Sequence, residues 1–348
     1  MDSLTQVVLG GAVAYAALGP KVGKKAVLYG AALGTLPDLD VFLPYAGEVE
    51  AFTYHRGFSH SIFVHLLFSP VLAWLLAKLH PISNNIKFSY SWIRWSILVF
   101  LCLSTHALLD ACTVYGTQLM WPFTEYPFGT SNLFIIDPLY TLPLLFALII
   151  CLLPNTSSMF KHKANTYALY VSSFYICWSF VAKVVIDYKV EQAFVSNNIK
   201  VKVYMSTPAP LNTFLWRAVA MSGTSDEYYE VYASVFDSPE QVSITNYPTS
   251  PELLSNIDND WGVQRLKWFT KGVYSISQKE DKVVLSDLRM GIECAYVFNF
   301  AVGQVTDKSI VLGDFEKVSQ RPSFDGVGSI FARITDPSVK LSPERPCT

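Results

Sequence analysis

The sequence predicts a polytopic α-helical membrane domain followed by a mostly β soluble domain, and charge distribution is the first reason. Residues 1–187 carry 19 charged side chains, whereas residues 188–348 carry 35. All six histidines also lie in the first part. A single soluble domain would not segregate its charges in this way, so we expect a transmembrane domain over 1–187 and a soluble domain over 188–348.

Apolar segments of nearly membrane-spanning length are the second reason. A bilayer core of about 30 Å needs about 20 apolar residues per helix. Six segments approach that length: 4–20, 26–45, 61–79, 93–112, 133–153 and 166–187. The first two are rich in small residues, which favours close helix packing. The lysines near the first segment follow it, so we expect a retained span and not a cleaved signal peptide.

Basic residues predict the orientation of these six segments. The first, third and fifth connections, with their flanks, hold eight lysines and arginines, whereas the second and fourth hold only Arg56. Because positive residues favour the cytoplasmic side, we expect the second and fourth connections and both termini outside. The chain would then be a multi-pass protein of a bacterial inner membrane with an extracytoplasmic C-terminal domain.

The soluble part carries the β signal, which is the third reason. YMSTPAPLNTFLWRAVAMSG, EYYEVYASVFD and KVVLSDLRMGIECAYVFNFAVG alternate β-branched and aromatic residues with polar ones. This part contains no nucleophile elbow, phosphate loop or metal motif. Cys294 and Cys347 could pair if the domain faces an oxidising compartment. The net charge of −2 and the absence of a basic stripe give no indication of a nucleic-acid partner, so none is expected.

Polar residues gather on the predicted outer side of the membrane. They occur in GTLPDLD, in YHRGFSHS, at the end of the fourth segment (STHALLDACTVYGT) and in FIIDP. The orientation came from lysines and arginines alone, so this convergence is independent support for a site. Its candidate residues are Asp38, Asp40, His55, His60, His106, Asp110 and Asp137.

The mixture of imidazoles and carboxylates predicts a bound divalent metal. Charged groups near a membrane span are costly, so they usually pair, line water or bind ions. Histidine with carboxylate suits zinc, with manganese or iron as alternatives, whereas an all-oxygen set would suggest magnesium or calcium. Three histidines and three aspartates exceed the needs of one tetrahedral zinc, so one or two ions are expected.

Each candidate also has a structural interpretation. Asp38 could end a helix, and Asp137 could cap one. His106 and Asp110, four residues apart on one helical face, could simply pair. We interpret the other three histidines, His65, His80 and His162, as structural or interfacial residues. The convergence of all these residues on one side of the membrane is what favours a functional site.

The motifs resemble a known family. MDSLTQVVLGGAVA, GAALGTLPDLDVF, YHRGFSHS and HALLDACTVYGTQLMWPF are similar to LexA-regulated, membrane-bound, metal-dependent hydrolases, also called YdjM-like inner-membrane proteins. The likeness covers residues 1–140 well and the later spans loosely, and it points to the subset with a C-terminal soluble domain. One departure is Gln6, where family members often have histidine. The resemblance implies a hydrolase with metal ligands Asp38, Asp40, His55, His60, His106 and Asp110. The layout is also similar, more loosely, to zinc-dependent phospholipase C.

The expected function is hydrolysis at the outer leaflet by metal-activated water. The substrate would be amphiphilic, a phospholipid or a lipid-linked phosphate. Arg56 would neutralise a phosphate, and Asp137 would be a further ligand or the base that orients water. Ser59, Ser61 and Thr113 would support the ligands.

Two alternatives remain open. One is a non-enzymatic membrane protein with a structural metal and a partner-binding tail. The other is an ion transporter, which would need polar residues continuing to the inner face, where the spans offer few. The oligomeric state is not predicted.

Overall fold

A computed structural model describes the chain except at residues 81, 83–86, 225, 308, 319–326 and 342–348. It divides into two compact units. One comprises Met1–Leu43 and Tyr54–Ser179 and is helical, and the other comprises Pro44–Thr53 and Phe180–Thr348 and is mostly β. The predicted fold class, a helical domain followed by a mostly β domain, is confirmed.

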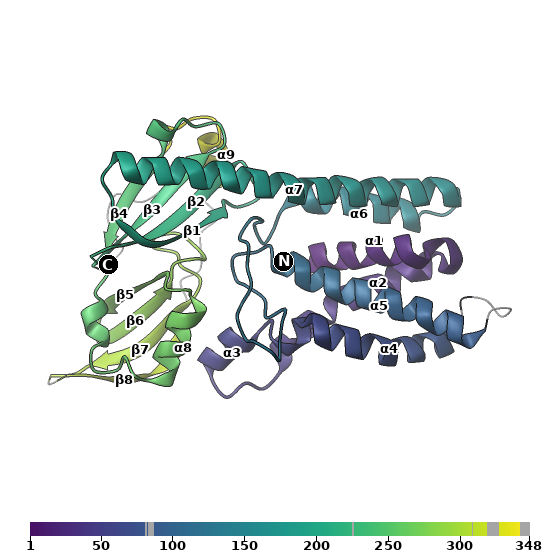
Figure 1. Ribbon diagram of the computed structural model, residues 1–348, viewed down its shortest axis with the longest axis horizontal. Helices are drawn as coiled ribbons and strands as arrows, with labels where there is room; N and C mark the ends of the chain where they lie inside the picture. The colour runs from purple at the N-terminus through teal and green to yellow at the C-terminus, as the bar shows by residue number, and fades with distance from the viewer. Residues whose placement is uncertain (81, 83–86, 225, 308, 319–326, 342–348) are drawn as a thin grey trace. The chain divides into compact units, whose positions relative to one another are not determined.

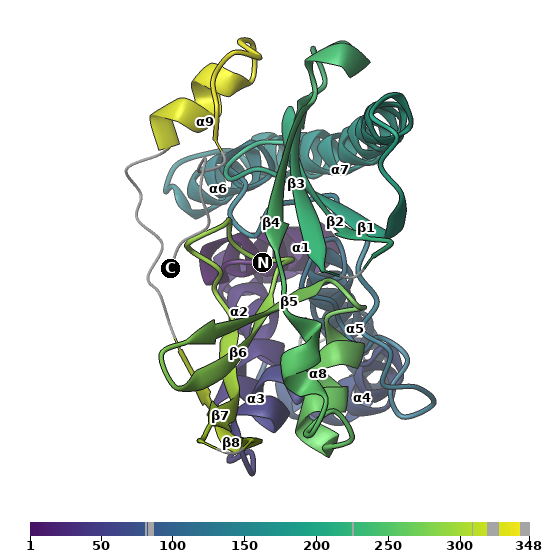
Figure 2. The same ribbon diagram turned by 90° about the vertical axis from the view of Figure 1, so that its left-hand side faces the viewer.

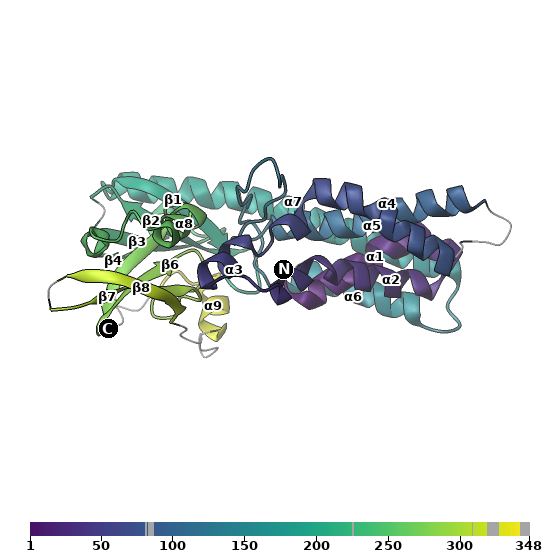
Figure 3. The same cartoon turned by 90° about the horizontal axis from the view of Figure 1, so that it is seen from below.

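The first unit is a bundle of helices that run side by side (Figures 1 and 3). Two short 3₁₀ turns, η1 (Pro37–Phe42) and η2 (Phe58–His60), interrupt the connections near one end of the bundle. The helices are α1 (Ser3–Val22), α2 (Lys24–Thr35), α4 (Ile62–Leu79), α5 (Phe88–Asp110), α6 (Pro138–Leu152) and the first half of α7 (Ser158–Ser196).

Within the described residues, four helices are long and apolar enough to cross a membrane, namely α1, α4, α5 and α7, and α6 is a shorter apolar helix. The expected span over 26–45 is not one helix. With 12 residues, α2 is only about 18 Å long. It ends before Pro37, whose ring and missing N–H do not permit the α-helix to continue, and η1 follows. Asp38 and Asp40 therefore lie on a 3₁₀ turn.

Glycines bring the backbones of α1 and α2 into direct contact. A Cβ placed on Gly10 would lie 2.2 Å from the Gly30 carbonyl oxygen. One placed on Gly34 would lie 2.4 Å from the Gln6 carbonyl oxygen. The small-residue packing predicted for these two segments is thus observed, and it fixes the end of α2, from which η1 begins.

The second unit contains two four-stranded antiparallel sheets, each with its strands in sequence order (Figure 2). The first comprises β1 (Val201–Pro208), β2 (Leu215–Ser222), β3 (Glu227–Ser234) and β4 (Ser243–Pro248). The second comprises β5 (Tyr274–Lys279), β6 (Lys282–Asp287), β7 (Asn299–Val305) and β8 (Ile310–Lys317). Further elements of this unit are α8 (Trp261–Phe269), α9 (Val327–Arg333) and two 3₁₀ turns, η3 (Pro239–Gln241) and η4 (Pro251–Leu254).

Apolar and charged contacts join the two sheets. A buried cluster combines Val219 and Tyr228 of the first sheet with Val273 and Leu288 next to the second. Arg217 on β2 forms a buried ion pair with Glu230 on β3 and donates from Nη1 to the carbonyl oxygen of Leu288 at 2.9 Å.

The short helix α3 (Glu48–Tyr54) comes from the connection between η1 and η2, yet residues 44–53 belong to the second unit. Phe52 is buried, and its ring centroid lies 4.9 Å, 4.6 Å and 5.1 Å from those of Phe269, Phe298 and Phe300. Glu48 also pairs with Lys317 at 2.7 Å. A segment between two membrane-domain elements is thus part of the core of the β domain.

Cys294, in the connection between β6 and β7, is disulfide-bonded. The partner expected for it, Cys347, lies outside the described residues.

Candidate metal centre

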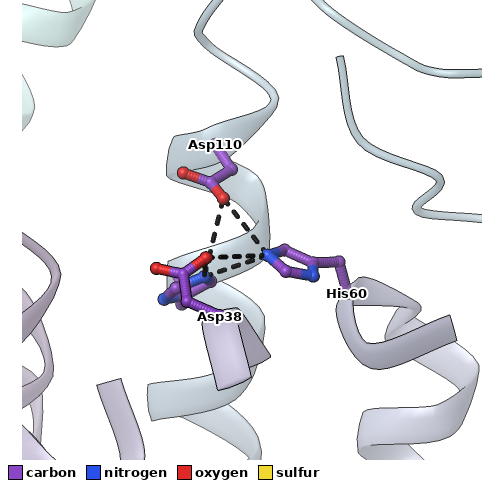
Figure 4. A group of neighbouring side chains, drawn as sticks. Asp38, His60 and Asp110 are labelled. Carbon is purple, nitrogen blue, oxygen red and sulfur yellow. Dashed lines mark hydrogen bonds and ion pairs between the residues drawn. The ribbon is translucent and has the colours of Figure 1, made fainter. Parts of the chain in front are cut away.

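Asp38, His60 and Asp110 point toward one another (Figure 4), and His106 completes a group of four side chains from three separate elements. Asp38 comes from η1 and His60 from η2. His106 and Asp110 lie one helical turn apart at the end of α5. Each offers one ligand atom, and among the described residues these four atoms form a group in which all lie within 4.8 Å of one another.

Five of the six separations among these atoms lie between 3.1 and 3.5 Å, and the sixth, between the two carboxylate oxygens, is within 4.8 Å. His60 Nε2 lies 3.1 Å from His106 Nε2. Asp38 Oδ1 lies 3.5 Å and 3.4 Å from these two nitrogens, and Asp110 Oδ2 lies 3.2 Å and 3.5 Å from them. Metal–ligand distances of about 2.0–2.1 Å in a tetrahedral zinc site give edges of about 3.3–3.4 Å. Charge-assisted hydrogen bonds are shorter, at about 2.7–2.9 Å. These five spacings are therefore compatible with ligands that share one divalent ion.

Hydrogen bonding around the group leaves lone pairs directed into it. His106 Nδ1 lies 2.6 Å from the Gly34 carbonyl oxygen, which can only accept a hydrogen bond. Nδ1 therefore carries the proton, and in the neutral ring Nε2 has a free lone pair. Asp110 Oδ2 is buried and has no well-aligned hydrogen bond among the described residues, although it pairs with Arg56 Nε at 3.1 Å. A bound cation would satisfy both atoms.

Asp110 is also oriented by its neighbours. Its Oδ1 accepts a hydrogen bond from Gln6 Nε2 at 2.9 Å and contacts the amino group of Met1. Its Oδ2 lies 3.1 Å from Arg56 Nε. Gln6, the departure from the family motif, thus lies against the site and holds one oxygen of the carboxylate, so that the other faces the group.

Arg56 is held in a backbone conformation unusual for a residue with a side chain. Its φ is 61°, in the left-handed region, and its N–H donates to Asp40 Oδ2 at 2.9 Å. The guanidinium donates to Thr113 Oγ1 at 3.1 Å and lies over the Tyr115 ring. The strained turn therefore buries a fixed cation beside Asp110. The role expected for Arg56 toward a substrate phosphate stays a prediction.

Asp40 and His55 form a pair next to the group. His55 Nδ1 lies 2.8 Å from Asp40 Oδ1, and Ser59 Oγ donates to Asp40 Oδ2 at 2.6 Å. Burial raises the pKa of the Asp40 carboxyl, but the hydrogen bond and charge of His55, the charge of His60 and the hydrogen bond from Ser59 together outweigh it and keep this pKa below its ordinary value. Both residues were expected to be metal ligands. That expectation, and with it a two-metal centre, stays a prediction.

Asp137 is the N-cap of α6. Its Oδ1 accepts from the backbone N–H groups of Leu139 and Tyr140, and its Oδ2 accepts from the hydroxyl of Tyr175 at 2.8 Å. These contacts agree with the structural interpretation of this residue. Its role as a further ligand or base is not tested by them and stays a prediction.

The remaining predicted residues take supporting positions. His65 lies 2.8 Å from the Ser59 carbonyl oxygen through Nε2, and His80 packs edge-on against Tyr29. Ser61 caps α4 and bonds to the Trp121 carbonyl oxygen. The sequence did not indicate the Gly34 carbonyl as a partner of His106, because a backbone acceptor carries no residue signature.

The transmembrane part of the chain matches known proteins. A family model described as YdjM inner membrane protein matches residues 1–186. The uncharacterized protein YfhP of Bacillus subtilis (strain 168) is 30% identical over 145 residues, which are 40% of this chain and 42% of that protein. The chain thus matches less than half the length of this relative. No solved structure matches the chain.

Proposed function

The chain belongs to the YdjM inner membrane protein family, and from this premise we propose that it is a metal-dependent hydrolase acting on an amphiphilic substrate. Membership of the family confirms the resemblance drawn from the motifs, and the chain is a membrane protein. The observation that carries the proposal is the convergence of two imidazole nitrogens and two carboxylate oxygens within 4.8 Å of one another. Zinc is the ion that this donor set and geometry favour.

The group has one accessible side. The Asp38 side chain is 26% exposed, whereas the side chains of His60, His106 and Asp110 are at most 1% exposed. Asp38 is therefore the ligand beside which water and substrate would enter. Because four protein ligands would fill a tetrahedral site, a water would have to bind as a fifth ligand or in place of Asp38, and zinc would lower the pKa of such a water to near neutrality. Arg56 lies against Asp110, and its guanidinium is the cation that we propose to neutralise an anionic ester beside the group.

Apolar side chains flank the ligands on the same short elements. Leu39, Val41 and Phe42 follow Asp38 on η1 and are exposed, with Phe42 at 81%. Phe58 precedes His60 on η2 and is also exposed. Exposed apolar residues next to a polar centre suit a molecule with a hydrocarbon part and a hydrolysable polar part. We therefore propose a phospholipid or a lipid-linked phosphate as the substrate class.

Three observations support the location that we propose for the site. Eight basic residues against one favour the outer side for the connection that holds η2. Residues 44–53 of this connection form one compact unit with the C-terminal domain, so both belong on the same side of a membrane. Disulfides such as that of Cys294 persist in oxidising compartments. We propose a multi-pass inner-membrane protein whose β domain is extracytoplasmic.

This topology predicts the behaviour of C-terminal fusions. Alkaline phosphatase, which needs an oxidising compartment, is expected to be active when fused after residue 348, and green fluorescent protein at the same place is expected to be dark in cells. If the green fluorescent protein fusion is fluorescent and the alkaline phosphatase fusion is inactive, the β domain lies in the cytoplasm and the proposal is contradicted.

Turnover is tested with protein purified in mild detergent through a C-terminal tag and without chelators. Vesicles of phosphatidylethanolamine and phosphatidylglycerol are expected to release a water-soluble headgroup product. A chelator should stop the release, and added zinc should restore it.

A second candidate function remains because four protein ligands are also the number found in structural zinc sites. In that case the metal would hold η1, η2 and α5 together, and the β domain would bind a partner. Stoichiometric metal without hydrolysis of either lipid would favour this second function.

A further inference from the structure

We propose that Ser59 is a positioning residue that sets the protonation pattern and orientation of the His60 ring, so that Nε2 is free to bind the metal. The inference rests on the metal centre proposed above. It concerns a residue that is not itself a ligand.

The hydrogen-bond geometry allows only one arrangement of protons around Ser59. Its Oγ lies 2.6 Å from Asp40 Oδ2 and 2.9 Å from His60 Nδ1. An ionised carboxylate only accepts, so the single hydroxyl proton of Ser59 is donated to Asp40. The hydroxyl oxygen is then left to accept from His60 Nδ1. In a neutral imidazole the proton on Nδ1 leaves Nε2 with a lone pair, and Nε2 is the atom 3.1–3.5 Å from the other three candidate ligand atoms.

Both ends of this chain of hydrogen bonds are fixed. Asp40 is held by His55 Nδ1 at 2.8 Å and by the Arg56 backbone N–H at 2.9 Å. The Ser59 backbone is held by His65, whose Nε2 donates to the Ser59 carbonyl oxygen at 2.8 Å. Asp40 and His65 are both buried, so bulk water does not readily replace these bonds. The serine hydroxyl is therefore held at the position that His60 needs.

His60 and His106 both carry the ring proton on Nδ1, but different partners accept it. His106 donates from Nδ1 to a backbone carbonyl, that of Gly34, which no side-chain substitution removes. His60 depends on the Ser59 side chain, which can be removed. Partners of this kind typically change metal affinity by about 10–100-fold. Ser59 is thus the position at which ring orientation can be tested without replacing a ligand.

The test compares zinc affinity in full-length, detergent-purified Ser59→Ala, Ser59→Thr and wild type, by competition with a chromophoric chelator. We expect Ser59→Ala to bind zinc about 10–100-fold more weakly. Ser59→Thr keeps the hydroxyl and is expected to remain within a few-fold of wild type. Ser96→Ala is the matched control and is expected to bind zinc as tightly as wild type, because the partly exposed Ser96 hydroxyl bonds within α5 to the Trp92 carbonyl oxygen, ten residues before His106.

Cobalt(II) substitution gives a second readout that is independent of turnover. Wild type and Ser59→Thr are expected to show the intense visible bands of a tetrahedral cobalt site, and Ser59→Ala is expected to show weaker or shifted bands. A Ser59→Ala protein that binds zinc as tightly as wild type would overturn the inference and leave the metal centre intact. Equal weakening in Ser59→Thr would also overturn it, since the hydroxyl would then not be the cause. A wild type that binds neither metal would instead reject the proposed function itself.

Discussion

Replacing Asp38 and His60 together by alanine is expected to remove bound metal from the purified protein. The double variant keeps only His106 and Asp110 of the four grouped residues, so one turn of α5 would have to hold the ion alone. The loss of affinity should exceed the roughly 10–100-fold expected for Ser59→Ala, because ligands and not their partners are removed. Elemental analysis after chelator-free purification gives the metal content per chain.

His80→Ala is the matched control for this loss. His80 lies at the opposite end of α4 from the group and packs against Tyr29. It is expected to retain one metal per chain. Metal retained by the Asp38→Ala/His60→Ala protein would show that the ion binds elsewhere. No transition metal in the wild type would leave the four side chains as a hydrogen-bonded core and move attention to partners of the β domain.

Replacing Phe52 by alanine is expected to destabilise the β domain by about 3–5 kcal/mol, the usual cost of removing a buried phenylalanine. The Phe52 ring fills a space between Phe269, Phe298 and Phe300, and the cavity left behind would expose three apolar rings. For a unit of this size the loss corresponds to a fall in Tm of roughly 6–20 °C. Thermal unfolding of the full-length protein, followed by circular dichroism at wavelengths that report strands, measures it.

Phe42→Ala is the control for this prediction, since Phe42 lies in the same connection but is 81% exposed. It should leave the unfolding of the β domain unchanged. A Phe52→Ala protein with wild-type unfolding would show that residues 44–53 do not contribute to the β-domain core. That result would also remove one support for placing the connection and the C-terminal domain on the same side.

Local features of the sequence determined the two-part fold and the chemistry of the site. Length and apolarity identify spanning helices, and alternation identifies strands, because each depends on residues close together in the chain. The four grouped residues were likewise among those predicted, because aspartate and histidine near a span have few roles besides pairing and binding ions. The grouping adds to that prediction without testing the role of each residue.

The tertiary structure alone decided which of the predicted residues meet. Asp38 and His60 face α5 because α1 and α2 approach through glycines and because the chain turns at Arg56 with a positive φ. Asp40 pairs with His55, and Asp137 caps a helix, although all three belong to the same residue classes as the grouped four. Proximity in space depends on backbone geometry summed over many residues, and residue type does not report it.

The position of residues 44–53 in the fold could likewise not be predicted from residue type. In sequence they read as a short connection between two apolar segments, with no periodicity that would assign them to a sheet-containing domain. Only the fold provides three phenylalanines, from beyond residue 260, around Phe52. The sequence by itself therefore determined the apolar helices other than the segment 26–45, the β character of the C-terminal part and the candidate ligands. The tertiary structure decided the grouping of four of them and the attachment of α3 to the β domain, because burial of one aromatic ring depends on partners more than 200 residues away.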